Sequence, residues 1–302
     1  MKGAVSASTK IPQRVNSEPA NLGWVVLHDR STERETDDAL QGVQTVVHLA
    51  ARVHVMVDNA ADPLQEFHRV NTDWTERLAA RAAAQGVRRF VYVSTVKVNG
   101  DQSIVPFTEM DPPRPQDPYG VSKWEAEQAL ARVSMRTGME TVVVRPPLVY
   151  GPGVRGNFLQ LLNILHRRIP LPLAGIHNQR SLVYLENLAD ALVRCIHDPR
   201  AAGRTYLVSD TEDLSTRELV RRLGAAMGTE VRLWTCPTAF LYWMGQVSGK
   251  RGMTDRLLGS LQVNSSTIQR ELDWCPPFTV DAGLSKTAAW FHARSKSLAP
   301  AP

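Results

Sequence analysis

The sequence is poor in cysteine and lacks long apolar runs. Its 302 residues include three cysteines, Cys195, Cys236 and Cys275, with no CxxC pair and no Cys/His cluster at metal-ligand spacing. This pattern excludes a disulfide framework, gives no metal site, and is typical of reduced thiols in the cytoplasm. A membrane span needs about 18 consecutive apolar residues and a signal peptide needs an apolar core. The sequence contains neither, so we expect a cytoplasmic protein without a membrane span.

The net charge is also small. Lysine and arginine exceed aspartate and glutamate by 35 − 30, which gives a net charge of +5. Because this surplus is small and spread along the chain, we expect no nucleic-acid partner, although an anionic small-molecule substrate is compatible with it. Collagen-like and disordered classes are excluded by 19 Gly, 19 Pro and a hydrophobic share of 43%.

Short apolar runs alternate with helical patterns. The expected strands are Trp24–Leu27, Thr45–Ala50, Phe90–Ser94, Thr141–Arg145, Ser181–Leu185 and Thr205–Val208. The expected helices are Asp62–Gln85, Asp117–Thr137, Asn157–Arg168 and Glu186–His197. Continuous apolar runs such as TVVHLA are typical of strands buried on both faces, and their alternation with helices predicts right-handed βαβ units. We therefore expect an α/β fold with a doubly wound parallel sheet.

The pattern loosens after about residue 150. A helix is expected at Ser215–Met227 and a short strand at Val231–Trp234. The apolar segment Pro237–Val247 is interpreted as a helix packed on the core or on a partner, with a membrane-surface role as the alternative. This half of the chain is expected to form a smaller α/β lobe that closes over the open end of the sheet.

The strongest chemical signal is the pair Tyr119 and Lys123 near the start of an expected helix. Residues four apart share one helix face. A nearby ammonium favours the phenolate, so we expect the tyrosine pKa to be lowered and the phenol to act as a general base or acid. The expected strand before them ends in Ser94 and Thr95, whose hydroxyls lie where open parallel sheets bind ligands.

Five motifs in order carry a family resemblance: VVHLAA, Asn71, STVKVNG, YGVSK and RPPLVYGPG. In this order and spacing, over roughly residues 20–295, the chain resembles the extended short-chain dehydrogenase/reductases. The similarity is greatest to the NAD-dependent epimerase/dehydratase branch, and within it to UDP-glucose and UDP-N-acetylglucosamine 4-epimerases. The resemblance implies a Rossmann-like NAD-binding domain at 1–150 and a mainly substrate-binding lobe at 151–302, with 181–210 returning strands to the core sheet.

The resemblance also implies residue roles. Tyr119 would be the catalytic base, Lys123 its partner and Thr95 the catalytic hydroxyl. The implied cofactor contacts are Asp29, Leu49, Ala50, Ala51, Asn71, Ser94, Tyr119, Lys123, Pro146 and Val149. The implied substrate contacts are Thr95, Asn157, Phe158, Arg180 and Arg256, the two arginines for the diphosphate.

The implied function is an NAD-dependent 4-epimerase of UDP-hexoses or UDP-N-acetylhexosamines in polysaccharide biosynthesis, working as a homodimer through transient oxidation at C4. NADP in place of NAD stays open. A 4-ketoreductase or dehydratase of the same family is the alternative, and a catalytically inactive sugar-nucleotide-binding relative is the alternative of another class.

One family feature is missing from the sequence. The G-x-x-G-x-x-G turn that holds the cofactor pyrophosphate at a helix N-terminus does not occur. The literal G-x-G-x-x-G at Gly151–Gly156 is not interpreted as this turn, because Pro152 removes a backbone donor. The resemblance implies a substrate-side loop there. We therefore expect the first strand and helix of the family fold to be absent from the printed chain. Weak NAD binding and exposure of Val46, Leu49 and Val91 beside the gap would follow.

Overall fold

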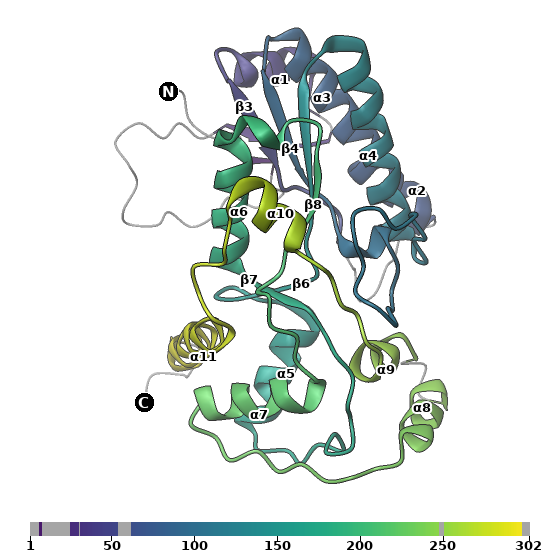
Figure 1. Ribbon diagram of the computed structural model, residues 1–302, viewed down its shortest axis with the longest axis vertical. Coiled ribbons are helices and arrows are strands. Elements are labelled where there is room, and N and C mark those ends of the chain that lie inside the picture. The colour runs from purple at the N-terminus through teal and green to yellow at the C-terminus, as the bar shows by residue number, and fades with distance from the viewer. Residues whose placement is uncertain (1–5, 8–24, 30, 54–61, 248–250, 298–302) are drawn as a thin grey trace.

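A computed structural model of the chain describes residues 6–7, 25–29, 31–53, 62–247 and 251–297 (Figure 1). Its centre is a four-stranded parallel sheet in the order β3-β4-β5-β8. These strands are β3 (Thr45–His48), β4 (Arg89–Val93), β5 (Glu140–Arg145) and β8 (Thr205–Leu207). Each lies within a residue or two of a predicted strand, so the predicted parallel α/β fold is confirmed.

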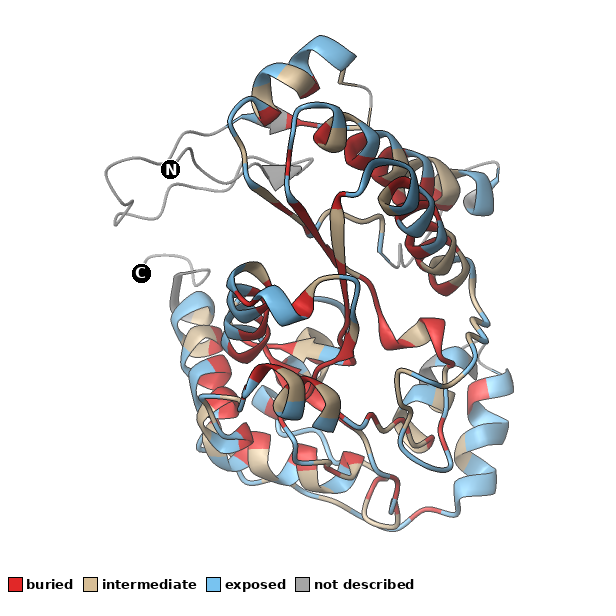
Figure 2. Ribbon diagram, turned by 45° about the horizontal axis from the view of Figure 1, so that its top comes forward, coloured by how far each residue is buried: buried red, intermediate tan, exposed pale blue. Residues whose placement is uncertain are grey.

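Helices cover both faces of this sheet. Phe90 and Tyr92 of β4 pack in one cluster with residues of α1 (Glu33–Leu40), α3 (Trp74–Ala84) and α4 (Pro118–Thr137). Val91, between them, packs in a second cluster with residues of α6 (Leu185–His197) and α10 (Ser266–Leu272). Figure 1 shows α4 and α6 on opposite sides of the sheet, and Figure 2 shows its central strands buried. This alternation explains why the strand sequences are apolar throughout.

Two short strands lie apart from the main sheet. β1 (Ser6–Ala7) pairs in parallel with β2 (Val26–Leu27), and within the described ranges neither is hydrogen-bonded to β3. The predicted exposure beside β3 is correct only for Leu49, which is 61% exposed. It is wrong for Val46 and Val91, which are 5% and 0% exposed. The reason is that packed helices cover both faces of these strands, whereas the side of β3 that has no partner among the described strands is only a hydrogen-bonding edge.

The second half of the chain has its own core. β6 (Leu148–Tyr150) pairs in parallel with β7 (Leu182–Tyr184), and α5 (Gly156–His166), α7 (Thr216–Ala226) and α11 (Val280–Ser297) surround them. Within 181–210, β8 therefore joins the main sheet, whereas β7 pairs with β6 instead. The predicted strand at Val231–Trp234 is wrong, because the only ladder contact there is a single bridge between Leu171 and Leu233.

A helical hairpin at the far end of this half carries exposed aromatic side chains. It consists of α8 (Thr238–Val247) and α9 (Arg251–Leu258), which pack closely where Gly245 of α8 meets Thr254 of α9. Leu241 packs against the core, whereas Phe240 and Trp243 of α8 are about half exposed and stack on each other. No helix in the described ranges is long and apolar enough to cross a membrane.

The predicted helix Asp62–Gln85 is divided by a wider turn. Asp62 caps α2 (Pro63–Phe67), a π-helix follows at His68–Asp73, and α3 continues from Trp74. Such π turns often occur at functional sites, and this one carries Asn71. Short 3₁₀ helices lie at Val96–Val98 and Pro199–Ala201.

Candidate active site

The start of α4 is built to present Tyr119. Asp117 caps the helix by accepting a hydrogen bond from the Gly120 amide at 2.7 Å, and Pro118 is its first residue. A Cβ at Gly120 would lie 3.1 Å from the Lys97 carbonyl oxygen, so only glycine fits without displacing the backbone. Tyr119 and Lys123 therefore stand one turn apart, as the spacing predicts.

Lys123 lies beneath the carboxyl end of β4. It is 1% exposed, its Nζ donates to the Val93 carbonyl at 2.7 Å, and Nζ lies 4.0 Å from the centre of the Tyr92 ring. Burial lowers the pKa of Lys123 to about 7, although the charge of Glu127 acts in the opposite direction. The Lys123 amino group can therefore gain or lose a proton near neutral pH.

The side chain of Tyr119 lies next to that of Thr95. Burial and the charge of Asp117 together raise the pKa of Tyr119 to about 12, while the neighbouring Thr95 hydroxyl favours the phenolate. The predicted lowering of this pKa by Lys123 is therefore wrong for the protein alone. The reason is that Lys123, with a pKa of about 7, is already neutral at the pH where Tyr119 titrates, so it offers the phenolate no positive charge.

A buried ion pair supports Ser94 and Thr95. Ser94 Oγ donates to Glu127 Oε1 at 2.5 Å, and Arg145 Nη2 lies 2.6 Å from Glu127 Oε2. Arg145 Nη1 also donates to Asn99 Oδ1 at 3.1 Å. Sequence reasoning missed Glu127, Arg145 and Asn99. For Glu127 a signal was present, because it follows Lys123 at the same four-residue spacing that separates Tyr119 from Lys123.

Asn71 joins the loop after β3 to α4. Its Oδ1 accepts from the Arg52 amide at 2.7 Å, and its Nδ2 donates to the Arg52 carbonyl and to Ser122 Oγ, both at 3.0 Å. Ser122 Oγ in turn donates to the Tyr119 carbonyl at 2.9 Å. The side chain of Asn71 is thus committed to fixing two segments of the site.

The other predicted cofactor residues are spread along the carboxyl edge. Leu49 is exposed, and Ala50 and Ala51 are half-buried. Pro146 is buried, and its carbonyl accepts from the Val96 amide, whereas Val149 packs partly against the core. Asp29 forms an ion pair with Arg69, so an adenine contact would have to share this carboxylate.

The predicted diphosphate arginines come together in the second half of the chain. Arg180 Nη1 donates to the Gly259 carbonyl at 3.0 Å, and its pKa is lowered by burial and by the charge of Arg256. Asn178, which sequence reasoning missed, donates to the Leu257 and Gly259 carbonyls and so anchors the end of α9. Two guanidinium groups that repel each other are an arrangement that a dianion would stabilise.

The loop between Thr95 and Tyr119 connects the two groups of residues. The Phe107 amide donates to the Gln262 carbonyl at 2.9 Å, and the Gln262 amide donates to Ser103 Oγ at 2.7 Å. The segment that follows α9 is thereby attached to the loop that leads into Tyr119.

Two predicted features of residues 151–158 have a packing explanation. Gly151 has a φ of 147°, and a Cβ there would lie 2.8 Å from the Leu185 Cβ, so packing requires this glycine. Asn157 is exposed at the start of α5. Phe158 is 4% exposed and stacks on Tyr150, which places it in the core and not in the site. Its predicted substrate contact is therefore wrong for the side chain.

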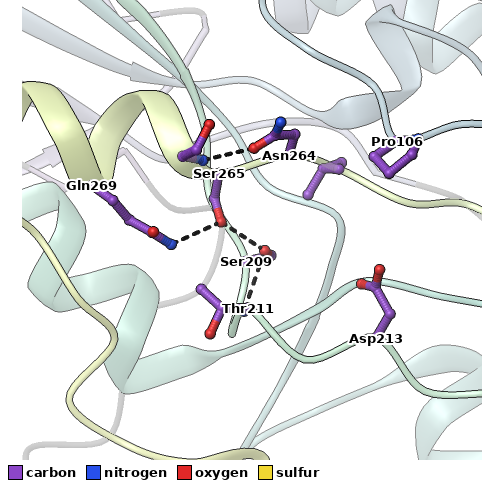
Figure 3. Close-up of a pocket in the computed structure, with 9 residues that line it drawn as sticks. Pro106, Ser209, Thr211, Asp213, Asn264, Ser265 and Gln269 are labelled. Carbon is purple, nitrogen blue, oxygen red and sulfur yellow. Dashed lines mark hydrogen bonds between the residues drawn. The ribbon is translucent and has the colours of Figure 1, made fainter.

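A separate polar hollow lies beyond the end of β8 (Figure 3). It has a volume of about 270 Å³, and Ser209 Oγ and Ser265 Oγ meet in it at 3.1 Å. None of the predicted site residues is among its nine lining residues.

A doubly wound sheet with a hydroxyl, a tyrosine and a lysine at its carboxyl edge defines a protein of the short-chain dehydrogenase/reductase class. Within this class, the sequence profile described as "NAD dependent epimerase/dehydratase family" matches residues 4–209. The chain belongs to this family.

Relatives agree with this assignment. The chain is 43% identical over 296 residues to a UDP-glucose 4-epimerase from Vibrio cholerae, covering 96% of this chain and 89% of that protein. It is 31% identical over 286 residues to a dTDP-glucose 4,6-dehydratase from Streptomyces griseus, covering 91% and 81%. The fold is similar to that of UDP-glucose 4-epimerase from Thermotoga maritima solved with UDP-glucose, with a TM-score of 0.76, 18% identity, and coverage of 97% and 92%.

Proposed function

We propose that the protein is an NAD-dependent 4-epimerase of UDP-hexoses or UDP-N-acetylhexosamines. The observation that carries the proposal is that Thr95, at the carboxyl end of β4, lies next to Tyr119, with Lys123 on the next turn of α4 and its Nζ bonded to the Val93 carbonyl. The 43% identity to a UDP-glucose 4-epimerase supports the choice of reaction.

The residues at the carboxyl edge of β4 suit proton transfer at a sugar hydroxyl. Thr95 holds O4 of the sugar while Tyr119 takes its proton, and a protonated Lys123 stabilises the phenolate that receives it. When bound, NAD would supply the hydride acceptor that oxidation at C4 requires, and the hydride donor for reduction of the 4-keto sugar on its opposite face. Tyr119 then gives the proton back to O4, so that atoms and charges balance over the cycle.

The residues present fit the nicotinamide and ribose half of NAD. The exposed Leu49 offers an apolar wall beyond β3, and the small Ala50 and Ala51 allow a flat ring to approach the backbone. An ammonium has three donors, of which Lys123 gives one to Val93, so a ribose hydroxyl can accept another. We therefore propose Leu49, Ala50, Ala51 and Lys123 as cofactor contacts in this half of the site. Asn71 is proposed to hold the loop after β3 in place for them.

Arg180 and Arg256 are the proposed diphosphate contacts. Burial and the charge of Arg256 both disfavour the charged form of Arg180, so a diphosphate bound beside Arg180 would offset part of that cost. Asn157, exposed at the start of α5, is the remaining proposed substrate contact.

Dehydration is less well supported than epimerisation. A 4,6-dehydratase must also remove water across C5 and C6, which needs a further acid–base pair. The two residues that follow Thr95 do not supply such a pair. Val96 has no acidic or basic group, and Lys97 is ion-paired with Asp117 and Asp101. The inactive-relative alternative does not account for Thr95, Tyr119 and Lys123 lying together.

We also propose a homodimer in the cytoplasm. The cysteines Cys195, Cys236 and Cys275 are all free, which suits a reducing compartment. Light scattering of the purified protein tests the dimer.

The test of the activity is Tyr119→Phe. With NAD supplied, wild-type protein is expected to interconvert UDP-glucose and UDP-galactose, or their N-acetyl forms, and the variant to be slower by about 100-fold or more. Tyr206→Phe is the matched control, because Tyr206 is buried on β8 and bonded to Glu271. Equal activity of Tyr119→Phe and wild type would refute the assignment, and net formation of NADH from the supplied NAD, without interconversion of the sugars, would indicate a ketoreductase working in reverse instead.

A further inference from the structure

Glu127 and Arg145 form a buried ion pair directly behind the candidate active site. Each side chain is 5% exposed, and two hydrogen bonds join them, Nη2 to Oε2 at 2.6 Å and Nε to Oε1 at 3.0 Å. Glu127 lies on α4 and Arg145 at the end of β5. A paired geometry of this kind offsets part of the large cost of burying two charges, and it fixes the helix to the sheet at the edge where the site lies.

The pair contacts the chain on both sides of Thr95. Glu127 Oε1 accepts from Ser94 Oγ at 2.5 Å, one residue before Thr95, and Arg145 Nη1 donates to Asn99 Oδ1 at 3.1 Å, four residues after it. The turn that carries the Thr95 hydroxyl is therefore held between two charged side chains.

Glu127 also acts on Lys123, four residues earlier on the same face of α4. Its negative charge favours the protonated lysine, against the effect of burial. The groups that face Lys123 are Glu127 and Tyr119 on α4, the Tyr92 ring and Val93 carbonyl on β4, and His48 on β3. Burial lowers the pKa of His48 to about 3, so His48 is neutral at working pH. Among these groups, Glu127 is the one whose negative charge stabilises the protonated form of Lys123.

We propose that Glu127 is a positioning residue for the epimerase reaction, which holds the Thr95 turn through Ser94 and keeps Lys123 protonated. The expected changes in kcat rest on the proposed epimerase function, whereas the expected change in the pKa of Lys123 does not. Arg145 orients Glu127 through two hydrogen bonds and balances its buried charge.

Glu127→Gln removes the charge and keeps the shape. The pKa of Lys123 is then expected to fall by about one unit or more, since a neighbouring opposite charge shifts a pKa by roughly that amount. The alkaline limb of the kcat profile should move to lower pH by the same amount, with KM for the UDP-sugar within about twofold. Glu127→Asp, which keeps the charge, should return the limb toward its wild-type position.

The chain offers a matched control at the opposite end of β5. The buried Arg89 of β4 donates from Nε to Glu140 Oε2 of β5 at 2.7 Å. Glu140→Gln disturbs a similar pair away from Lys123, so its kcat profile should keep the wild-type shape. An alkaline limb that stays in place in Glu127→Gln, or moves equally in Glu140→Gln, would overturn the proposal.

Two further measurements keep the proposal testable if these variants fold poorly or turn over no substrate. Ser94→Ala breaks only the contact to the Thr95 turn, and kcat should fall by about tenfold without a shift of the alkaline limb; an unchanged kcat contradicts the positioning role. Nuclear magnetic resonance of lysines labelled at Cε, with Lys123→Met to assign the signal, reports the Lys123 pKa directly. If wild-type protein converts no UDP-sugar, the proposed function fails, whereas this titration still decides whether Glu127 controls Lys123.

Discussion

Replacing Lys123 with methionine is expected to stabilise the fold while it removes activity. A buried ammonium is costly, and the structure places the pKa of Lys123 at about 7 against 10.5 for a free lysine. Each pKa unit corresponds to about 1.4 kcal/mol, so the charged lysine costs about 5 kcal/mol at pH 6. Methionine has a similar length and no charge, but it leaves the Val93 carbonyl without the lysine donor, at about 1–3 kcal/mol. The net gain at pH 6 is then about 2–4 kcal/mol.

The gain should shrink as the pH rises. The folded-state pKa of Lys123 is below its unfolded value, so the unfolded chain holds more protons between about pH 7 and 10.5, and wild-type stability rises through this window. The penalty on the charged lysine is complete below pH 7 and falls to about 2 kcal/mol at pH 9. The advantage of the methionine variant should therefore decrease by roughly 3 kcal/mol between pH 6 and pH 9.

Urea unfolding of both proteins at pH 6, 7.5 and 9 measures this difference, and titrations common to both proteins cancel. Lys286→Met is the control, because it makes the same substitution at a lysine that is 43% exposed and paired with Glu186, where no charge is buried. A Lys123→Met variant that is less stable than wild type at pH 6, or whose advantage does not change with pH, would refute the assigned burial cost.

Three further outcomes are expected. Arg180→Ala should weaken binding of UDP and UDP-sugars by tenfold or more and leave free sugar unaffected, as measured by calorimetry, and unchanged UDP affinity removes Arg180 from the site. Phe158→Ala should lower the free energy of unfolding by about 3–5 kcal/mol, because Phe158 fills the second core, and a surface-like effect below about 0.5 kcal/mol would contradict its placement. Gly245→Ala should lower the thermal midpoint, since its Cβ would lie 2.1 Å from Thr254 Oγ1, whereas at Gly252 the nearest atom is 3.9 Å away and alanine should be tolerated.

The main sheet and the catalytic group could be predicted because both are local in the sequence. The apolar runs fix where strands lie, and the four-residue spacing of Tyr119 and Lys123 places them on one face of α4. The ion pair of Glu127 with Arg145 could not be predicted, because the partners are 18 residues apart and meet only when α4 packs on β5.

The prediction of a lowered Tyr119 pKa was wrong for a related reason. That pKa depends on how deeply Tyr119 and Lys123 are buried, and spacing along a helix does not specify burial. Phe158 was misplaced because the core that receives it is assembled from Tyr150 and residues far along the chain, which no local pattern reveals.

The π-helix at His68–Asp73 has a consequence for how the segment tolerates length changes. An α-helix turns about 100° per residue, so removing one residue from the wide turn would rotate α3 by that angle relative to α2. Trp74 and Leu78, which now face the sheet, would be carried toward the side of the helix. Asn71 would lose its simultaneous reach to Arg52 and Ser122. The additional residue in the π-helix thus sets the rotation of α3 relative to α2, so that one helical segment contributes side chains to both the core and the site. A single deletion there should therefore lower the stability of the fold more than several substitutions would.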